Sequence, residues 1–160
     1  GVYDAVFDLL LEEELGVSIA TGFGAEEDIV ALMRRPEQNV CTDGLFGLKP
    51  HPRGYGSFAR ILQTYVRERK ILTLEEAVYK MSGKAAQVFS LEDRGRIAIG
   101  KRADVLLFDD DALEDHATYL EPDQFPTGFH SIFVNGGPVY QNGRDTDALP
   151  GMVIRQVPFF

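Results

Sequence analysis

The sequence predicts an α/β fold in two parts: the end of a larger parallel α/β unit at residues 1–90, and a small antiparallel β unit at residues 91–160. The first part alternates short apolar runs with helical patterns, an order that gives parallel strands joined by right-handed crossovers. The second part is rich in Asn-Gly turn signals, which join antiparallel strands. Two strands are too few for a free-standing parallel sheet, so we expect the first part to belong to a larger unit.

The first part begins with two helices, each followed by a short strand. The expected order is helix 4–15, strand 17–20, helix 25–35 and strand 40–42. Gly16 is a plausible left-handed residue at the end of the first helix. Arg34 and Arg35 suit the last turn of the second helix through its dipole, and Pro36 ends it.

The clearest helical pattern covers residues 57–69, with Ser57 as the expected N-cap. Its apolar residues recur at intervals of three and four: Phe58, Ile61, Leu62, Tyr65 and Val66. Thr73 and Glu76 have the spacing of a capping box and open another helix. A short helix is expected at residues 84–89.

The second part should contain four strands or more. Two are expected at residues 95–100 and 103–109, and a hairpin at residues 130–134 and 139–141 encloses the sequence Asn135-Gly136-Gly137. Pro138 cannot donate a hydrogen bond to a sheet, so its strand should lie at an edge or begin there. Residues 110–129 form a long connection between strands.

Composition limits the classes of function. The net charge of −9 argues against nucleic acid or an anionic membrane as a partner. No apolar run approaches the length of a membrane span. The single cysteine, Cys41, excludes an internal disulfide and fits a reducing compartment, so we expect a cytoplasmic protein.

The loop at residues 42–56 gathers the candidate chemistry: the Asp43 carboxylate, the His51 imidazole and the Arg53 guanidinium. Asp43 precedes a glycine and could simply form a turn, or it could be a catalytic acid at the end of a strand. A metal site needs three or four ligands, whereas the sequence has three scattered histidines and no metal-binding motif. A complete metal site in this chain alone is therefore not expected.

Three stretches carry a resemblance to a known family: TDGLFGLKPHPRGYGSFARIL, LTLEEAVYKMSGKAAQVFSLEDRGRIAIGKRADVLLFD and the tail YLEPDQFPTGFHSIFVNGGPVYQNGRDTDALPG. They resemble the C-terminal part of the N-acyl-D-amino-acid deacylases (D-aminoacylases), in the metal-dependent amidohydrolase superfamily. The resemblance implies a (β/α)8 barrel with zinc at its mouth and a β-sandwich. This chain would supply the last strands and helices of the barrel and part of the sandwich, and the zinc ligands would lie upstream.

The resemblance also implies roles for single residues. Asp43 would take a proton from the zinc-activated water and pass it to the leaving amine. Arg53 would bind the α-carboxylate of the substrate, for which a planar guanidinium is well suited.

Apart from the resemblance, His51 could orient the loop, contact the substrate or cap a neighbouring group. Tyr55 is expected to pack beside Gly54 and Gly56, or to form a hydrogen bond to the substrate. Cys41 is expected to be a buried, small core residue.

The expected function is hydrolysis of an N-acyl-D-amino acid, a small-molecule substrate, to a D-amino acid and a carboxylate. Two alternatives remain: a cyclic-amide hydrolase of the dihydroorotase or hydantoinase kind, and a non-catalytic homologue. The two remaining histidines, His116 and His130, are expected to be surface or packing residues. As part of a longer enzyme, the chain should expose unpaired strand edges and could form homo-oligomers through them.

Overall fold

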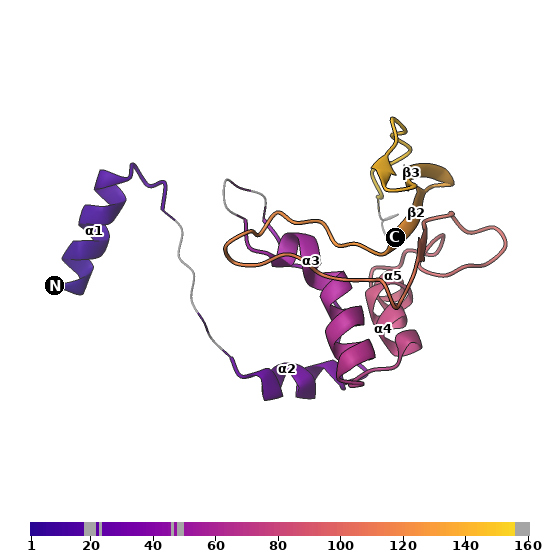
Figure 1. The fold of residues 1–160 in the computed structure, drawn as a ribbon, viewed down its shortest axis with the longest axis horizontal. Coiled ribbons are helices and arrows are strands. Elements are labelled where there is room, and N and C mark those ends of the chain that lie inside the picture. Colours follow the sequence, from indigo (N-terminus) through magenta and orange to yellow (C-terminus); the bar gives the residue numbers. More distant parts are fainter. Residues whose placement is uncertain (18–21, 23, 46, 48–49, 156–160) are drawn as a thin grey trace, which may run out of the picture. The chain divides into compact units, whose positions relative to one another are not determined.

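The computed structural model describes all residues except 18–21, 23, 46, 48–49 and 156–160. Its contacts divide the chain into two compact units, Gly1–Val30 and Ala31–Phe160 (Figure 1). Within the described residues, no helix combines the length and the apolar character needed to cross a membrane. The strand expected at residues 17–20 falls almost wholly outside the described residues, so that expectation stays a prediction.

The first unit contains helix α1 (Val2–Glu12) and the start of helix α2 (Glu26–Met33). Helix α1 ends earlier than expected, so the left-handed residues after it are Glu14 (φ 48°) and Leu15 (φ 65°). The assignment of this role to Gly16 was therefore wrong. No residue of α1 is buried. Arg34 and Arg35 follow α2 instead of occupying its last turn.

The central helix of the second unit begins four residues earlier than predicted. Helix α3 (Arg53–Arg60) continues directly into the π-helix η1 (Ile61–Glu68). Pro52 occupies the N-cap, where its missing N–H costs nothing. Ser57 is not the N-cap: it lies inside the helix, and its hydroxyl donates a hydrogen bond to the Arg53 carbonyl at 2.8 Å.

Helices α4 (Leu74–Met81) and α5 (Gly83–Val88) follow as predicted. The capping box is present, because the Glu76 N–H donates to Thr73 Oγ1 at 3.2 Å and the Thr73 N–H donates to Glu76 Oε2 at 2.8 Å. These two bonds satisfy backbone N–H groups at the start of α4 that would otherwise lack a hydrogen-bond acceptor within the helix.

The sheet has four antiparallel strands in the order β1-β2-β3-β4. They are, in sequence order, β1 (Val105–Phe108), β2 (Phe129–Val134), β3 (Gly137–Gln141) and β4 (Arg144–Asp145). Asn135 and Gly136 both have positive φ, as a tight two-residue hairpin turn requires, which confirms the predicted hairpin. Strand β4 pairs with β3 only at Tyr140 and Gln141, so Pro138 has no partner residue in β4. This suits a proline, which has no N–H to donate to a second strand.

Two predicted strands, at residues 40–42 and 95–100, do not form. The residues at 40–42 belong to no helix, strand or turn, and no described strand pairs with them. In the second segment Gly95 has φ 82°, and Ile97 and Ile99 are fully solvent-exposed. A segment with a strand-like pattern forms a strand only where a neighbouring strand pairs with its backbone. The described residues provide no such neighbour for these two segments.

The apolar core of the second unit lies between the helices and residues 110–129, hereafter the connecting segment. Its buried apolar residues are Met33, Val40, Ala59, Ile61, Leu62, Tyr65, Leu72, Ala77, Ala86, Leu113 and Ala117. The connecting segment runs alongside α3 and η1 (Figure 1), and the Arg67 guanidinium donates a hydrogen bond to the Asp110 carbonyl at its beginning. The segment therefore packs on the helix that begins at Arg53.

Candidate functional site

Asp43 lies in a tight turn that packs against the start of α3. It has φ 47°, a left-handed conformation that aspartate tolerates better than most residues. The next N–H, of Gly44, donates to Thr42 Oγ1 at 3.1 Å. A Cβ on Gly44 would lie 2.8 Å from the Cα of Gly54, so the two backbones touch and only glycine fits at position 44.

This glycine contact brings together two predicted site residues, Asp43 and Arg53. Each immediately precedes one of the touching glycines, and Arg53 Nη2 lies 3.0 Å from Asp43 Oδ2. The Asp43 side chain is 81% exposed and that of Arg53 40%, so the ion pair contributes little to stability.

The backbone at the start of α3 leaves no donor for an anion. The N–H groups of Arg53, Gly54, Tyr55 and Gly56 are all bonded within the segment, to His51 Nδ1 or to the carbonyls of His51 and Pro52, at 3.0–3.1 Å. A helix N-terminus often binds anions through such groups, but these are occupied. An anionic ligand here would therefore rely on the Arg53 side chain, whose buried Nε has no partner among the described residues.

His51 and Tyr55 each contact an aromatic ring of the connecting segment. The His51 ring meets Tyr119 edge to face, with centroids 5.1 Å apart, and Tyr55 meets Phe125 in the same way at 5.3 Å. His51 Nδ1 accepts the Arg53 N–H at 3.1 Å, which leaves the proton of the neutral ring on Nε2. His51 is thus fixed on two sides with a donor remaining.

The other sequence candidates lie apart from this group. Cys41 is exposed, so the expectation of a buried core cysteine was wrong; it lies in the unpaired stretch before the turn. His116 and His130 are exposed, and His116 Nε2 pairs with Thr127 Oγ1 at 2.9 Å, as surface residues would. In the described part of the chain, no group of three or more His, Cys, Asp or Glu residues could hold a metal ion.

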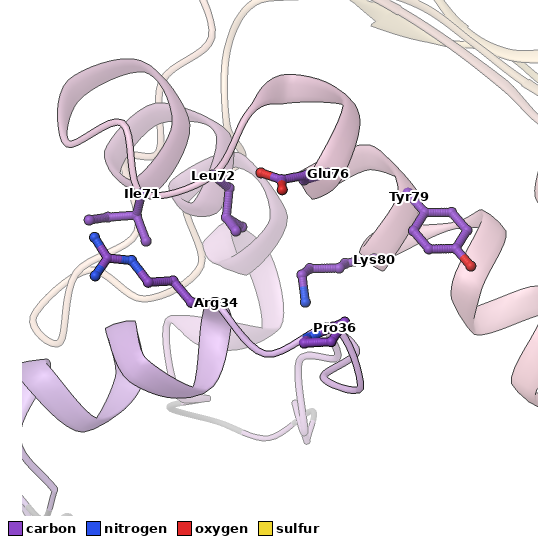
Figure 2. Close-up of a pocket in the computed structure, with 7 residues that line it drawn as sticks. All are labelled: Arg34, Pro36, Ile71, Leu72, Glu76, Tyr79 and Lys80. Atoms are coloured by element: carbon purple, nitrogen blue, oxygen red, sulfur yellow. The ribbon is translucent and has the colours of Figure 1, made fainter.

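A pocket of about 210 Å³ lies elsewhere, and none of its lining residues is a predicted site residue (Figure 2). Its most unusual group is Lys80, which is 6% exposed. The Lys80 ammonium donates to the carbonyls of Arg35 at 2.5 Å and Gln38 at 3.2 Å. Burial lowers the pKa of Lys80 below its ordinary value. The Lys80 ammonium therefore ties α4 to the chain segment that follows α2.

Comparison with known proteins defines the class. A model of the amidohydrolase family matches residues 4–140, and the chain belongs to this family, in its D-aminoacylase branch. It is 35% identical over 158 residues to an N-acyl-D-aspartate deacylase of Alcaligenes xylosoxydans xylosoxydans, covering 94% of this chain and 32% of the relative. It is 43% identical over 129 residues to an N-acyl-D-glutamate deacylase of the same organism, covering 78% of this chain and 26% of the relative.

Solved structures agree. A crystal structure of D-aminoacylase superposes with a TM-score of 0.75 at 35% identity, covering 78% of this chain and 26% of that one. The N-acyl-D-glutamate deacylase of Bordetella bronchiseptica, complexed with zinc and a phosphonate that mimics the tetrahedral intermediate, gives 0.71 at 39% identity, covering 75% and 26%. Dihydroorotases of Lactobacillus match less of the chain, 54%, at 31–33% identity. The chain spans less than a third of the length of the deacylase relatives.

Sequence reasoning missed the contacts that organise the site. Tyr119 and Phe125 lie about 70 residues from the rings they touch, in a segment read only as a connection. The Gly44–Gly54 contact was also missed. The one available signal was the spacing of glycines in DG and RGYG, which marks positions of close backbone approach.

Proposed function

We propose that this chain is the C-terminal portion of a zinc-dependent hydrolase that cleaves N-acyl-D-amino acids to a D-amino acid and a carboxylate. The observation that carries the proposal is the 3.0 Å approach of Asp43 to Arg53, a proton acceptor beside a carboxylate anchor. Membership of the D-aminoacylase branch supports it. In the same proposal, residues 1–90 complete a (β/α)8 barrel and residues 91–160 contribute to a β-sandwich.

Asp43 would move the proton. Amide hydrolysis needs a group that removes a proton from the attacking water and a group that delivers one to the leaving amine. An ionised carboxylate can do both in turn, and that of Asp43 is exposed at a turn held by Gly44. The described residues do not by themselves fit a zinc ion, so we place the zinc ligands outside them.

Arg53 would bind the substrate's α-carboxylate. Its guanidinium uses one Nη for Asp43 and retains the donors of the other Nη. A carboxylate held there would lie next to Asp43, with the scissile amide one carbon away. His51, with its free Nε2 donor, and Tyr55 would line the same side of the substrate. Fixing the carboxylate beside the proton acceptor is a means of selecting one enantiomer.

The test uses the full-length protein loaded with zinc. We expect hydrolysis of N-acetyl-D-amino acids and none of their L-enantiomers, hydantoins or dihydroorotate. Asp43→Asn should abolish turnover, because an amide cannot accept the proton. Arg53→Ala should raise KM by about ten- to a hundredfold, the worth of a hydrogen bond between charged groups. Arg96→Ala, which removes another exposed arginine, is the matched control and should change neither constant.

Preference for a hydantoin or dihydroorotate would instead favour the cyclic-amide alternative, and a protein inactive on every substrate would favour the non-catalytic one. We also propose a cytoplasmic location, based on the single cysteine, and self-association through the edge of β1. Among the described strands β1 pairs only with β2, and Leu106 and Leu107 on it are more than half exposed.

A further inference from the structure

We propose that Tyr119 and Phe125 are positioning residues that hold His51 and Tyr55 in place for substrate binding. The inference rests on the proposed function, since it concerns the same site. The connecting segment carries no predicted catalytic group. The proposal gives it a role in ordering the loop that carries Asp43.

The ring contacts pair two residues of the site with two of the connecting segment. His51 with Tyr119 and Tyr55 with Phe125 both adopt the edge-to-face geometry that aromatic rings prefer, with interplanar angles of 81° and 72°. Three residues separate His51 from Tyr55, and five separate Tyr119 from Phe125. Such paired contacts restrain the loop and the first turn of α3 together.

The connecting segment is itself fixed to the same helix. The Asp115 N–H donates to Gln63 Oε1 at 2.9 Å, and Asp115 Oδ1 accepts the Ala117 N–H at 3.0 Å. The Asp115 side chain is only 6% exposed and packs on Gly56, where a Cβ would come within 1.9 Å of its Oδ1. The segment is therefore anchored four residues before Tyr119 and can act as a rigid support.

The two rings are largely exposed within this chain. Tyr119 is 74% exposed and Phe125 77%, so burial of apolar area explains little of their placement in this chain. Their partners are the two residues expected to contact substrate. His51 is thereby fixed by Tyr119 on one side and by the Arg53 N–H on the other, with Nε2 left to donate.

A double-mutant cycle in the full-length enzyme tests the proposal. Tyr119→Ala should raise KM for an N-acyl-D-amino acid by about two- to tenfold, as expected for one edge-to-face pair, and leave kcat nearly unchanged. Tyr119→Phe should restore the wild-type KM, because it keeps the ring. In a His51→Ala background Tyr119→Ala should have little further effect. The Phe125 and Tyr55 pair should give the same result: Phe125→Ala should raise KM, and it should have little further effect in a Tyr55→Ala background. Phe125→Tyr should restore the wild-type KM.

Leu120→Ala is the control, because Leu120 adjoins Tyr119, is 94% exposed, and should leave KM unchanged. Additive effects of the His51 and Tyr119 substitutions, or a failure of Tyr119→Phe to rescue, would overturn the proposal. If the wild-type enzyme hydrolyses no N-acyl-D-amino acid, the proposed function fails. Crystal structures still decide the inference: a His51 ring that keeps its Arg53 N–H bond in Tyr119→Ala refutes it, and a displaced ring supports it.

Discussion

Substituting Gly56 by alanine tests whether the connecting segment is held by its fit to α3. A Cβ on Gly56 would lie 1.9 Å from Asp115 Oδ1 and 2.5 Å from its Cγ, so the carboxylate must move by more than 1 Å. That movement breaks the bond from the Ala117 N–H, a hydrogen bond to a charged group worth about 1.5–3 kcal/mol. Alanine stabilises the helix by about 1 kcal/mol relative to glycine, because of its higher helix propensity. The expected net cost is therefore about 0.5–2 kcal/mol, localised to the connecting segment.

Hydrogen–deuterium exchange followed by mass spectrometry measures this cost locally. Amides near residue 117 should exchange about two- to thirtyfold faster in Gly56→Ala than in the wild type. Gly54→Ala is the matched control: it lies in the same helix, but its Cβ would meet nothing within 4 Å, so exchange should be unchanged or slower. Equal exchange in the two variants would show that the Gly56–Asp115 contact does not hold the segment.

Three further predictions concern other contacts. Gly44→Ala should separate Asp43 from Arg53 and lower kcat/KM at least tenfold, whereas Gly47→Ala, whose Cβ would meet no atom of the described residues within 4 Å, should not; steady-state kinetics decides. Thr73→Ala should cost about 0.5–2 kcal/mol in chemical denaturation by loss of the capping box, and Thr73→Ser should restore it. Because burial lowers the pKa of Lys80, the unfolded chain binds more protons than the folded chain just below pH 10.5, so stability should rise with pH there. Thermal unfolding of Lys80→Met should lack this rise.

Local signals predicted local structure well. The capping box of Thr73 and Glu76 and the hairpin at Asn135-Gly136 form as expected, because each depends on residues within a few positions. The strands at residues 40–42 and 95–100 failed because a strand depends on a partner, which no local pattern supplies.

The start of α3 was missed for a related reason. Gly54 and Gly56 lower the helix propensity of residues 53–56, yet Gly56 is required there because Asp115 occupies the space of a side chain. The candidate site was predicted in its residue types, Asp43 and Arg53, but the contact between them depends on backbone packing. The roles of these residues stay predictions until the kinetic tests are made.

The contact between Gly44 and Gly54 closes the intervening loop at its base. Residues inserted between positions 45 and 50 would lengthen a loop whose ends are already held together. Doubling such a loop costs only about 0.6 kcal/mol of closure entropy. Asp43 and Arg53 lie at that closed base, 3.0 Å apart, so they would keep their places. Loop length is therefore a variable that evolution or protein engineering can change while Asp43 and Arg53 stay paired.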